Sequence, residues 1–581
     1  MRSTRSLVLA SSPDRRASGR LAAALVVAGR AFPFALAVAG LVAAIVAQVR
    51  MGAIGDVSWM IVIAEKWLDG AVPYVDFVET NPPAAILLYL PPVALARGLG
   101  LHAEFVVAAW GFAACGGCVA LAAAILRRGG LLGEFGPASV GAAILALTLL
   151  PGRAFDERDF FIALLALPPL AAAAARAAGA PLGFGWACVA GLAMAALIAV
   201  KPPYGLIVAA PALYVASRRG LAALLSAAEY WIAACALALY AGLIAWRFPV
   251  YGRDVLPAVI AAYLPVRETA ISLVANVAVV GWAALTTALA LVAGRAFWRP
   301  SIAVPAMASF AALMVYFIQG KGWLYQAYPA LALMGLAFGV ALDRRGAAPR
   351  GRIFALAGGL VAALAASLMP FSPFVCAVAV SFVGAVAFLV AGGARLAPAE
   401  REWRLAELAA ATMTGALWVF YCAPPTAPDA EFVRAVASLG PHPRLAAIAE
   451  GLGIGFPLVR QVDGLWVQRS QGLLLASGGR HLIDEHPSDQ ALAARLQPII
   501  ARDAEMVAED IRRNRPDGVL INTVNPRFHD WALGEPAIAA ALADYTFATS
   551  SRAVDWPIDL YVRRDSLGLR PQLAEPSPPL P

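Results

Sequence analysis

Long apolar runs separated by short polar loops are the dominant pattern along this chain of 581 residues. Most runs have about the 17–25 residues that a helix needs to cross the hydrocarbon core of a bilayer. The pattern therefore predicts an all-α polytopic membrane bundle of about thirteen spans, which begins with the run at 31–49. The remaining predicted spans are 103–126, 137–151, 160–178, 182–200, 203–216, 222–246, 270–294, 301–318, 325–342, 353–369, 373–391 and 404–421.

One further apolar stretch, residues 84–100, is not expected to cross the membrane. It is short, and Pro91-Pro92 interrupts it in a way that breaks a helix interior. We expect an interfacial or partly inserted helix there. This choice matters, because counting the stretch as a span would invert every later loop.

The arginines set the orientation of the bundle. With residues 1–30 placed in the cytoplasm as an N-terminal tail, the loops richest in arginine also fall in the cytoplasm, as the positive-inside rule requires. The extracytoplasmic side then receives the first outer loop, 50–83, all of 424–581, and four further segments that carry polar motifs. These four segments are 153–160, 201–204, 247–269 and 319–329.

The region 424–581 differs in kind from the 31–423 membrane region, because it has no long apolar run. Residues 490–514 have the periodicity of an amphipathic helix, and 518–524 have the pattern of a strand. The alternation continues with a helix in 536–545 and strands in 546–551 and 558–564. We therefore predict a small α/β domain on the outer face.

Composition supports these assignments. A chain that is 61% hydrophobic and 14% charged is too apolar for a soluble globular protein. The net charge of +8 does not indicate nucleic-acid binding, because the arginines bracket apolar runs and form no basic stripe. Cys115 and Cys118 have the spacing of a metal or redox pair, but packing inside a span is favoured. The 31–49 run is interpreted as a retained span rather than a signal peptide.

Lysine is rare: only Lys66, Lys201 and Lys321 occur among 45 basic residues. All three fall in predicted outer loops. Lysine is a compact point charge suited to phosphate, whereas arginine forms a planar fork. The three positions could be accidental, but we expect at least two of the lysines to serve a common anionic site, since charge beside a membrane is costly to keep.

Acidic residues gather in the first outer loop, which holds five carboxylates and one lysine between Gly55 and Pro83. Asp56 follows the first span almost at once, and it could act as a general base. It could instead be a solvated loop acid, or cap the helix that follows, and a cap could also serve as the base. Glu79 precedes Asn81-Pro82-Pro83, a rigid extended stretch that would hold it in place. A second charged group, FDERDF at 155–160, adjoins the start of a span.

Several catalytic signatures do not occur in the sequence. It contains no phosphate-binding loop, no dinucleotide-binding glycine fingerprint, no HExxH and no nucleophile elbow. His481 and His486 lie near Asp484 and Glu485 and could ligate a metal, but their spacing favours a polar loop. We therefore expect neither a metal nor a cofactor.

These motifs resemble polytopic GT-C glycosyltransferases, and in particular bacterial members of the family 39 type, which include aminoarabinose transferases and relatives of protein mannosyltransferases. The likeness covers the membrane region. It rests on Asp56, 67–70, Pro73-Tyr74, Asp76, Glu79 and Pro82-Pro83, on 155–168, on KPPY at 201–204 and on QGKGWLYQAYP at 319–329. The chain departs from the family pattern at Asp159 and Gln326, where histidines are expected.

The resemblance implies transfer of a sugar from a polyprenyl-phosphate donor to an envelope lipid, glycan or protein, with inversion, outside a bacterial inner membrane. It implies Asp56 as the general base and Glu79 as its catalytic neighbour. The residues expected to bind substrate are Tyr74, Asp76, Glu157, Arg158, Lys201, Lys321, Trp323 and Tyr325.

Two other classes stay open at this point. A secondary transporter or flippase would also be polytopic, but such proteins tend to show internal repeats and polar residues at mid-span. Here the charges lie at span ends. A non-catalytic scaffold whose outer domain binds a partner is the third class, and it would tolerate loss of Asp56.

Overall fold

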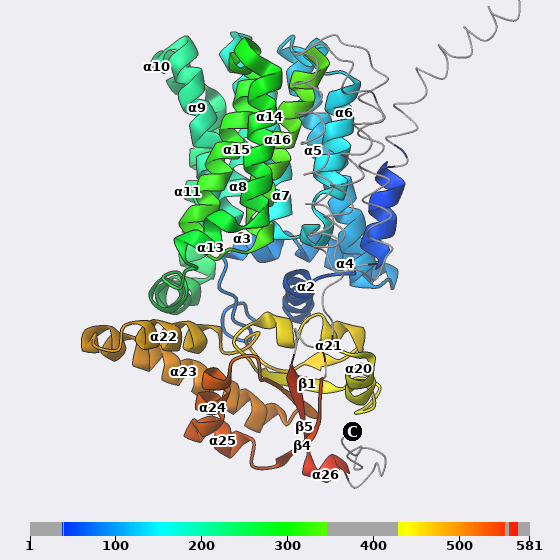
Figure 1. The fold of residues 1–581 in the computed structure, drawn as a ribbon, viewed down its shortest axis with the longest axis vertical. Coiled ribbons are helices and arrows are strands. Elements are labelled where there is room, and N and C mark those ends of the chain that lie inside the picture. The colour runs from blue at the N-terminus through cyan, green and yellow to red at the C-terminus, as the bar shows by residue number, and fades with distance from the viewer. Residues whose placement is uncertain are drawn as a thin grey trace, which may run out of the picture.

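The computed structural model describes residues 38–344 and 428–567, except 39, 51, 552 and 554–556. Figure 1 shows a bundle of long helices with a smaller domain at one end. The predicted spans at 353–369, 373–391 and 404–421 lie outside the described residues, as does the tail 1–30.

Five described helices are long and apolar enough to cross a membrane: α5 (Ala103–Arg128), α7 (Arg158–Ala178), α11 (Ala228–Arg247), α15 (Pro300–Gln319) and α16 (Leu324–Arg344). Six result if the bent pair Gly40–Arg50 and α2 (Gly55–Leu68) is one span. Shorter helices complete the described bundle: α6 (Pro137–Ile144) with η2 (Leu145–Leu149), α8 (Phe184–Val200), α9 (Gly205–Arg219), α10 (Leu221–Leu225), α13 (Ala270–Ala275) and α14 (Val277–Ala293). The predicted count of thirteen is not confirmed.

Helix α7 forms the centre of the bundle. It packs against α5, α8, α9, α15 and α16, and most of its apolar window is buried by protein. By contrast, α11 is largely exposed, with Trp231 and Trp246 near its two ends 57% and 79% exposed. Tryptophans at both ends of an exposed apolar helix are typical of the two membrane interfaces.

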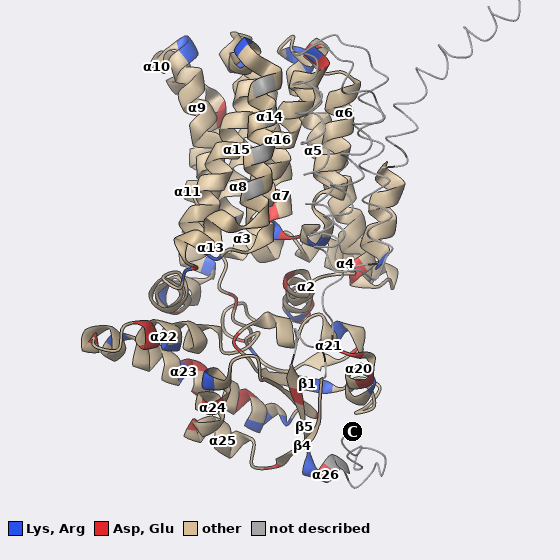
Figure 2. Cartoon of the chain, viewed as in Figure 1, with Lys and Arg blue, Asp and Glu red and all other residues tan. Residues whose placement is uncertain are grey.

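Charged residues avoid the middle of the bundle and gather at its ends (Figure 2). The end far from the smaller domain carries Arg127 and Arg128 on α5 and Arg218 and Arg219 on α9. This distribution agrees with the orientation expected from the arginines, in which that end faces the cytoplasm.

The first outer loop folds into helices at the other end of the bundle. Helix α2 is bent by 72° from Gly40–Arg50 and lies between the bundle and the smaller domain (Figure 1). Residues 84–100 form two short helices, α3 (Pro83–Leu87) and α4 (Leu90–Leu99), rather than one span. Prolines occupy the first turn of α4, where a missing N–H costs nothing.

The 247–269 segment is mostly helical and not an irregular loop. Helical turns run through Tyr251–Val255, Leu256–Ala258 and Val259–Tyr263, named η5, α12 and η6. The segment packs on α22 (Leu474–Glu485) of the smaller domain. The sequence did not predict a helix here, because Arg253 and Asp254 interrupt the apolar run.

The smaller domain is built on a five-stranded mixed sheet in the order β2-β1-β3-β5-β4. The strands are β1 (Arg444–Ile448), β2 (Leu465–Trp466), β3 (Gly518–Asn522), β4 (Tyr545–Ser550) and β5 (Ile558–Arg563). The helices are α20 (Ala430–Ala437), α21 (Leu458–Gln461), α22, α23 (Gln490–Asn514), α24 (Pro526–Gly534), α25 (Pro536–Ala541) and α26 (Arg564–Leu567). The alternation expected from the sequence is present, and α23 has the expected bounds.

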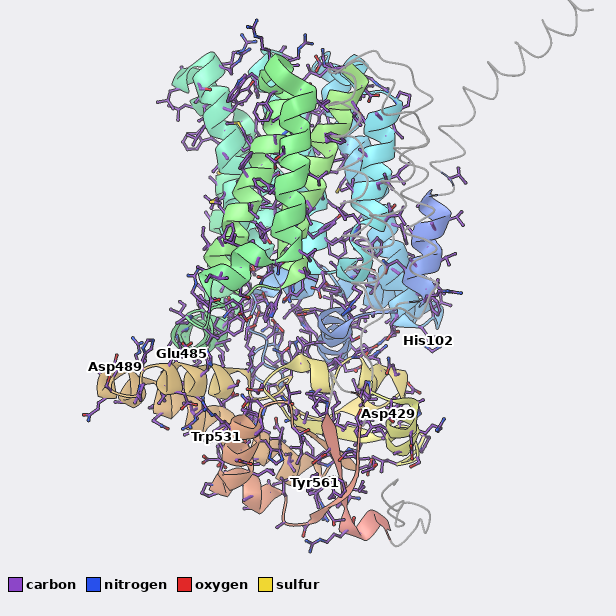
Figure 3. All side chains as sticks on the ribbon, viewed as in Figure 1. His102, Asp429, Glu485, Asp489, Trp531 and Tyr561 are labelled. Carbon is purple, nitrogen blue, oxygen red and sulfur yellow. The ribbon has the colours of Figure 1, made fainter. Side chains whose placement is uncertain are left out.

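Specific contacts join the smaller domain to the bundle. Arg460 pairs with Glu65 of α2 and Glu104 of α5, each at 2.7 Å. The Lys66 ammonium donates to the Gln468 carbonyl at 2.6 Å. Figure 3 labels Glu485 and Asp489 at the turn between α22 and α23, where this helix pair projects from the domain.

Candidate active site

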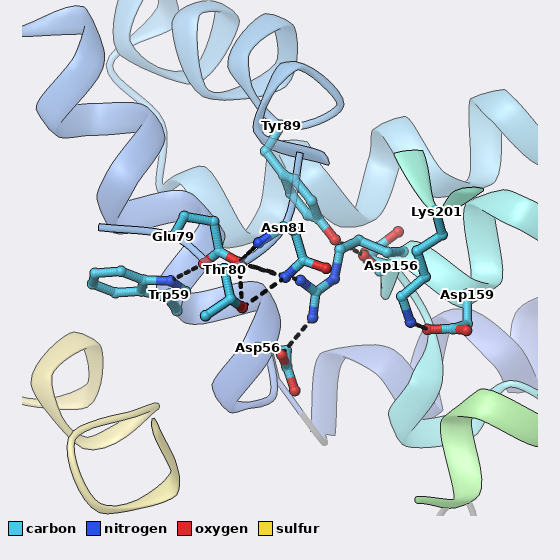
Figure 4. Close-up of polar contacts among 10 residues, drawn as sticks. Asp56, Trp59, Glu79, Thr80, Asn81, Tyr89, Asp156, Asp159 and Lys201 are labelled. Carbon is cyan, nitrogen blue, oxygen red and sulfur yellow. Dashed lines mark hydrogen bonds and ion pairs between the residues drawn. The ribbon is translucent and has the colours of Figure 1, made fainter. Parts of the chain in front are cut away.

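A cluster of charged side chains lies at the end of the bundle that faces the smaller domain (Figure 4). We call it the Asp56–Arg158 cluster, and it comprises Asp56, Glu79, Glu157, Arg158, Asp159 and Lys201. Three separate segments bring these residues together: the start of α2, the stretch before α3, and the junction that precedes and begins α7. The α8–α9 connection adds Lys201.

Asp56 lies in the first turn of α2, where it accepts a hydrogen bond from Arg158 Nη2 at 2.7 Å. The N-cap of the helix is Ile54 and no side chain caps it, so the alternative in which Asp56 caps the helix is wrong. The Asp56 side chain is 18% exposed. Burial raises the pKa of Asp56 above its ordinary value of 3.8, with Arg158 opposing and Glu79 adding to the rise.

Glu79 is almost fully buried and holds several groups at once. Its carboxylate accepts from the Trp59 indole at 2.5 Å and from the Asn81 backbone N–H at 2.9 Å, and also bonds the Asn81 side-chain amide. Arg158 Nη1 lies 3.7 Å away. These donors occupy the carboxylate, so in this structure Glu79 positions Trp59 and Arg158 rather than facing an open space.

The residues just before α7 carry acceptors without partners. Glu157 is fully buried, and neither of its carboxylate oxygens has a hydrogen-bond partner among the described residues. The same holds for Oδ1 of Asp156. Burial raises the pKa of both carboxyls well above their ordinary values. Gly111 of α5 makes room here, because a Cβ at that position would lie 1.9 Å from Asp156 Oδ1.

Lys201 is paired deep in the same cluster. Its ammonium donates to Asp159 Oδ2 at 2.6 Å, and the Tyr204 hydroxyl bonds the other Asp159 oxygen. Tyr204 also contacts the Gln326 carbonyl at 2.9 Å. The Gln326 side-chain oxygen is buried and has no partner among the described residues. The KPPY and QGKGWLYQAYP motifs therefore meet around Asp159.

Aromatic rings lie beside both Lys201 and Lys321. Lys201 Nζ lies 5.6 Å from the centre of the Tyr325 ring, and Trp323 lies 5.6 Å from Tyr325, centre to centre. Lys321 Nζ is 4.1 Å from the centre of the Tyr263 ring. Trp323 is 41% exposed, so this group of rings reaches the surface.

Lys321 differs from Lys201 in its partners. Its ammonium donates to the carbonyls of Tyr263 and Val266, each at 2.6 Å, and so uses two of its three N–H groups. Burial, together with nearby Arg267, lowers the pKa of Lys321 to about 8. It thus ties the helical 251–263 segment to the bundle. Lys66, the third lysine, is held by the Gln468 carbonyl of the smaller domain instead.

Two residues expected to bind substrate have local roles. The buried Tyr74 donates to the Asn81 carbonyl at 2.8 Å and packs on Tyr251. Asp76 is exposed, and its carboxylate accepts from the Val72 N–H at 2.7 Å, which closes a turn. Among the described residues, Asp76 makes no hydrogen bond or ion pair with the Asp56–Arg158 cluster, so the structure does not bring it into the site.

Sequence reasoning missed Trp59 and Tyr204, which orient Glu79 and Asp159. Both lie inside stretches that the sequence marks as motifs, yet nothing in the sequence shows which carboxylate each one meets. Among the described residues, no group of three or more His, Cys, Asp or Glu side chains is placed to hold a metal ion.

Comparison with known proteins identifies the fold. No family model and no curated protein matches the chain. The crystal structure of ArnT from Cupriavidus metallidurans bound to undecaprenyl phosphate is similar at a TM-score of 0.56 and 17% identity, over 94% of this chain and 99% of that one. Its apo state matches with a TM-score of 0.54, at 17% identity over 92% and 98%. The chain therefore shares its fold with these two ArnT structures.

Proposed function

We propose that this protein is a glycosyltransferase that moves a sugar from a polyprenyl-phosphate donor to an acceptor hydroxyl in the cell envelope. The reaction inverts the anomeric carbon. The fold is shared with a protein whose crystal structure holds undecaprenyl phosphate, which supports a lipid-phosphate donor. A bacterial inner membrane with the site on the periplasmic side fits the arginine distribution.

The observation that carries the proposal is the Asp56–Arg158 pair. A partly exposed carboxylate lies 2.7 Å from a buried guanidinium, at the end of a membrane bundle. A base must be ionised, oriented and accessible to its substrate. Arg158 supplies the orientation and favours the charged form, while burial makes the carboxylate more basic than a free aspartate.

In this reaction Asp56 takes the proton from the acceptor hydroxyl as that oxygen attacks the anomeric carbon. The bond from the anomeric carbon to the phosphate oxygen breaks on the opposite face, which gives inversion. Negative charge then grows on the polyprenyl phosphate. Arg158 and Lys201 are the buried cations of the cluster, and preorganised cations stabilise such charge in a site that excludes water.

The other members of the cluster hold substrate or neighbours in place. Glu79 lies 3.7 Å from Arg158 Nη1, while Asp56 bonds Nη2, so both carboxylates hold the guanidinium. Glu157 offers two buried carboxyl oxygens that have no partner among the described residues, and such a group suits hydroxyls of the transferred sugar. Tyr325 presents its ring face to Lys201 with Trp323 beside it, and Lys321 secures the segment that carries Tyr263.

The decisive experiment replaces Asp56 by asparagine. Asp56→Asn keeps the shape of the side chain but cannot accept the proton, so transfer should fall on the order of 10²–10⁴-fold. Cells with and without the gene are first compared by mass spectrometry of surface glycans and lipid-linked sugars, which defines the product. The variant is then measured for that product.

Asp69→Asn is the matched control. Asp69 follows the same helix, is 66% exposed, and among the described residues forms its ion pair with Arg97 at the surface. We expect this control to retain transfer. Full transfer by Asp56→Asn at normal protein abundance would show that Asp56 is not the general base. A flippase for an envelope precursor would then be the better candidate function.

A further inference from the structure

The sheet of the smaller domain contains a switch point, at which the order of successive strands changes from one side of β1 to the other. From β1 the chain moves to β2 on one side, and it then returns past β1 to β3 on the other. Helices cover both faces: Leu445 and Ala447 of β1 pack in the core that contains α21, whereas Ala446 and Ile448 pack in the core with α22 and α23. β1 is parallel to both neighbours. In open α/β sheets, such a switch point forms a binding crevice at the carboxyl ends of the strands.

Polar side chains converge at that place, between the ends of β1 and β3. Glu450 follows β1 by two residues, and its carboxylate accepts from Asn525 Nδ2 at 2.9 Å and from Ser477 Oγ at 3.3 Å. Asn522, the last residue of β3, donates to the other carboxylate oxygen at 3.4 Å. We call Glu450, Ser477, Asn522 and Asn525 the switch-point cluster.

The amides of this cluster are held in one orientation. Asn522 Oδ1 accepts from the Val524 N–H at 2.8 Å, and Asn525 Oδ1 accepts from the Phe528 N–H at 3.4 Å. Their NH₂ groups therefore point to Glu450, and each keeps a second N–H for a ligand. Two of the bonds to Glu450 are long, so its carboxylate also has accepting capacity left.

The charge of the cluster selects among ligands. Glu450 forms no ion pair among the residues that the structure describes, and the side chains that hydrogen-bond to it are neutral. An anion would be repelled by this carboxylate, so the cluster does not suit a phosphate. A carboxylate beside amide N–H groups and a hydroxyl offers both acceptors and donors, which matches neighbouring hydroxyls of a saccharide, each of which donates and accepts.

The switch-point cluster also lies at the junction with the membrane part. Leu452 lies two residues after Glu450 and packs against Gly55, the neighbour of Asp56. A Cβ on Gly55 would lie only 2.5 Å from the Leu452 side chain. Gly478 is next to Ser477, and a Cβ on Gly478 would lie 2.3 Å from the Ala262 carbonyl oxygen of the membrane part. A Cβ on Gly451 would meet nothing within 4 Å, so the loop beside Glu450 faces open space.

We infer that the switch-point cluster is a saccharide-binding site, which holds hydroxyl groups of the acceptor glycan while another part of it reaches Asp56. This role rests on the proposed glycosyl transfer. Binding itself does not depend on catalysis, so the two can be tested apart.

Saturation-transfer NMR on the full-length protein in detergent tests binding directly. The probes are glucose, galactose, mannose, arabinose and N-acetylglucosamine, with inorganic phosphate followed by ³¹P line broadening as the anionic probe. Glu450→Gln keeps the size of the side chain but removes its charge, and Ser477→Ala removes the hydroxyl. Asp530→Asn, on α24 and 82% exposed, is the control.

We expect at least one saccharide to bind the wild-type protein and the control equally. Glu450→Gln should weaken that saccharide about tenfold or more, as loss of a hydrogen bond to a charged group typically does, and Ser477→Ala should weaken it less. The inference is overturned if no saccharide binds the wild type, if both variants bind as the wild type does, or if phosphate binds at a site that Glu450→Gln alters. Asp56→Asn should bind the saccharide as the wild-type protein does. If this variant binds the saccharide and also transfers sugar at the wild-type rate, the result counts against the proposed function and not against the binding site.

Discussion

The Asp56 carboxylate is subject to two opposing influences, and their balance gives a pH prediction. Burial raises its pKa and Arg158 lowers it. A general base works in its ionised form, so transfer should fall as pH drops through the Asp56 pKa, above 3.8. Arg158→Gln removes the opposing charge and should move this acid limb to higher pH, whereas Arg158→Lys should move it less. The pH dependence of kcat/KM measures the acid limb. If both variants kept the acid limb of the wild-type protein, the assignment of Asp56 as the general base paired with Arg158 would be contradicted.

Lys201 and Asp159 form a buried ion pair, so their structural and functional roles have to be separated. Lys201→Met leaves the Asp159 charge uncompensated, and breaking a buried pair in this way costs about 3–5 kcal/mol. Lys201→Met combined with Asp159→Asn should recover most of the melting temperature, because asparagine can still accept from Tyr204. If Lys201 stabilises the leaving phosphate, the double variant folds but stays poorly active. Wild-type transfer by that variant would assign Lys201 a purely structural role.

At the scale of elements, the smaller domain positions the helix that carries Asp56. The Phe456 ring meets the Trp59 ring edge-on at 5.4 Å, and Trp59 in turn donates to Glu79. The Val78 N–H donates to the Arg469 carbonyl at 2.7 Å, so the domain also holds the chain next to Glu79. Both carboxylates that flank Arg158 are thus set by residues more than 370 positions away in the sequence.

Phe456→Ala tests this coupling. Deleting the ring leaves Trp59 without its partner, so Glu79 and Asp56 should lose their fixed geometry and transfer should drop roughly 10- to 100-fold, which is the cost of about 1 Å of misplacement. Phe547→Ala, an equal deletion at an exposed position of β4, should have little effect. Hydrogen exchange of residues 55–68 should quicken in the first variant alone. Unchanged exchange and transfer would show that the domain does not position α2.

The sequence predicted elements better than pairings. The long apolar runs predicted helices of the bundle, and the periodicity of residues 490–514 predicted α23. Both signals arise from the burial of a single segment, so they can be found in the local sequence alone. The polar network depends on which loops meet, and no spacing reveals that Trp59 reaches Glu79 or that Asp76 turns away. The alternative in which Asp56 caps α2 is wrong by a small boundary error, since the helix begins at Gly55, two residues earlier than a cap at Asp56 requires. The 251–263 helical segment was missed because charged residues interrupt its apolar positions.

At the scale of the whole molecule, sequence and structure place the Asp56–Arg158 cluster, the switch-point cluster and the smaller domain at one end of the bundle. Every part of the proposed reaction then depends on which side of the membrane this end faces. The arginine-rich ends of α5 and α9 at the opposite pole favour the cytoplasm for that pole. A lipid-linked donor would meet Asp56 only from the extracytoplasmic leaflet.

Cysteine labelling tests the orientation of the intact protein. Ser488→Cys lies in the exposed turn between α22 and α23, and Arg218→Cys lies at the opposite end of the bundle, both in a background without native cysteines. A membrane-impermeant maleimide that reaches the periplasm should label position 488 in intact cells, while position 218 should react only after the inner membrane is permeabilised. The reason is that a folded bundle does not reverse its loops, so one labelled position fixes the side of all the others. The reverse pattern would place Asp56 in the cytoplasm, away from any extracytoplasmic acceptor, and would remove the proposed reaction along with the topology.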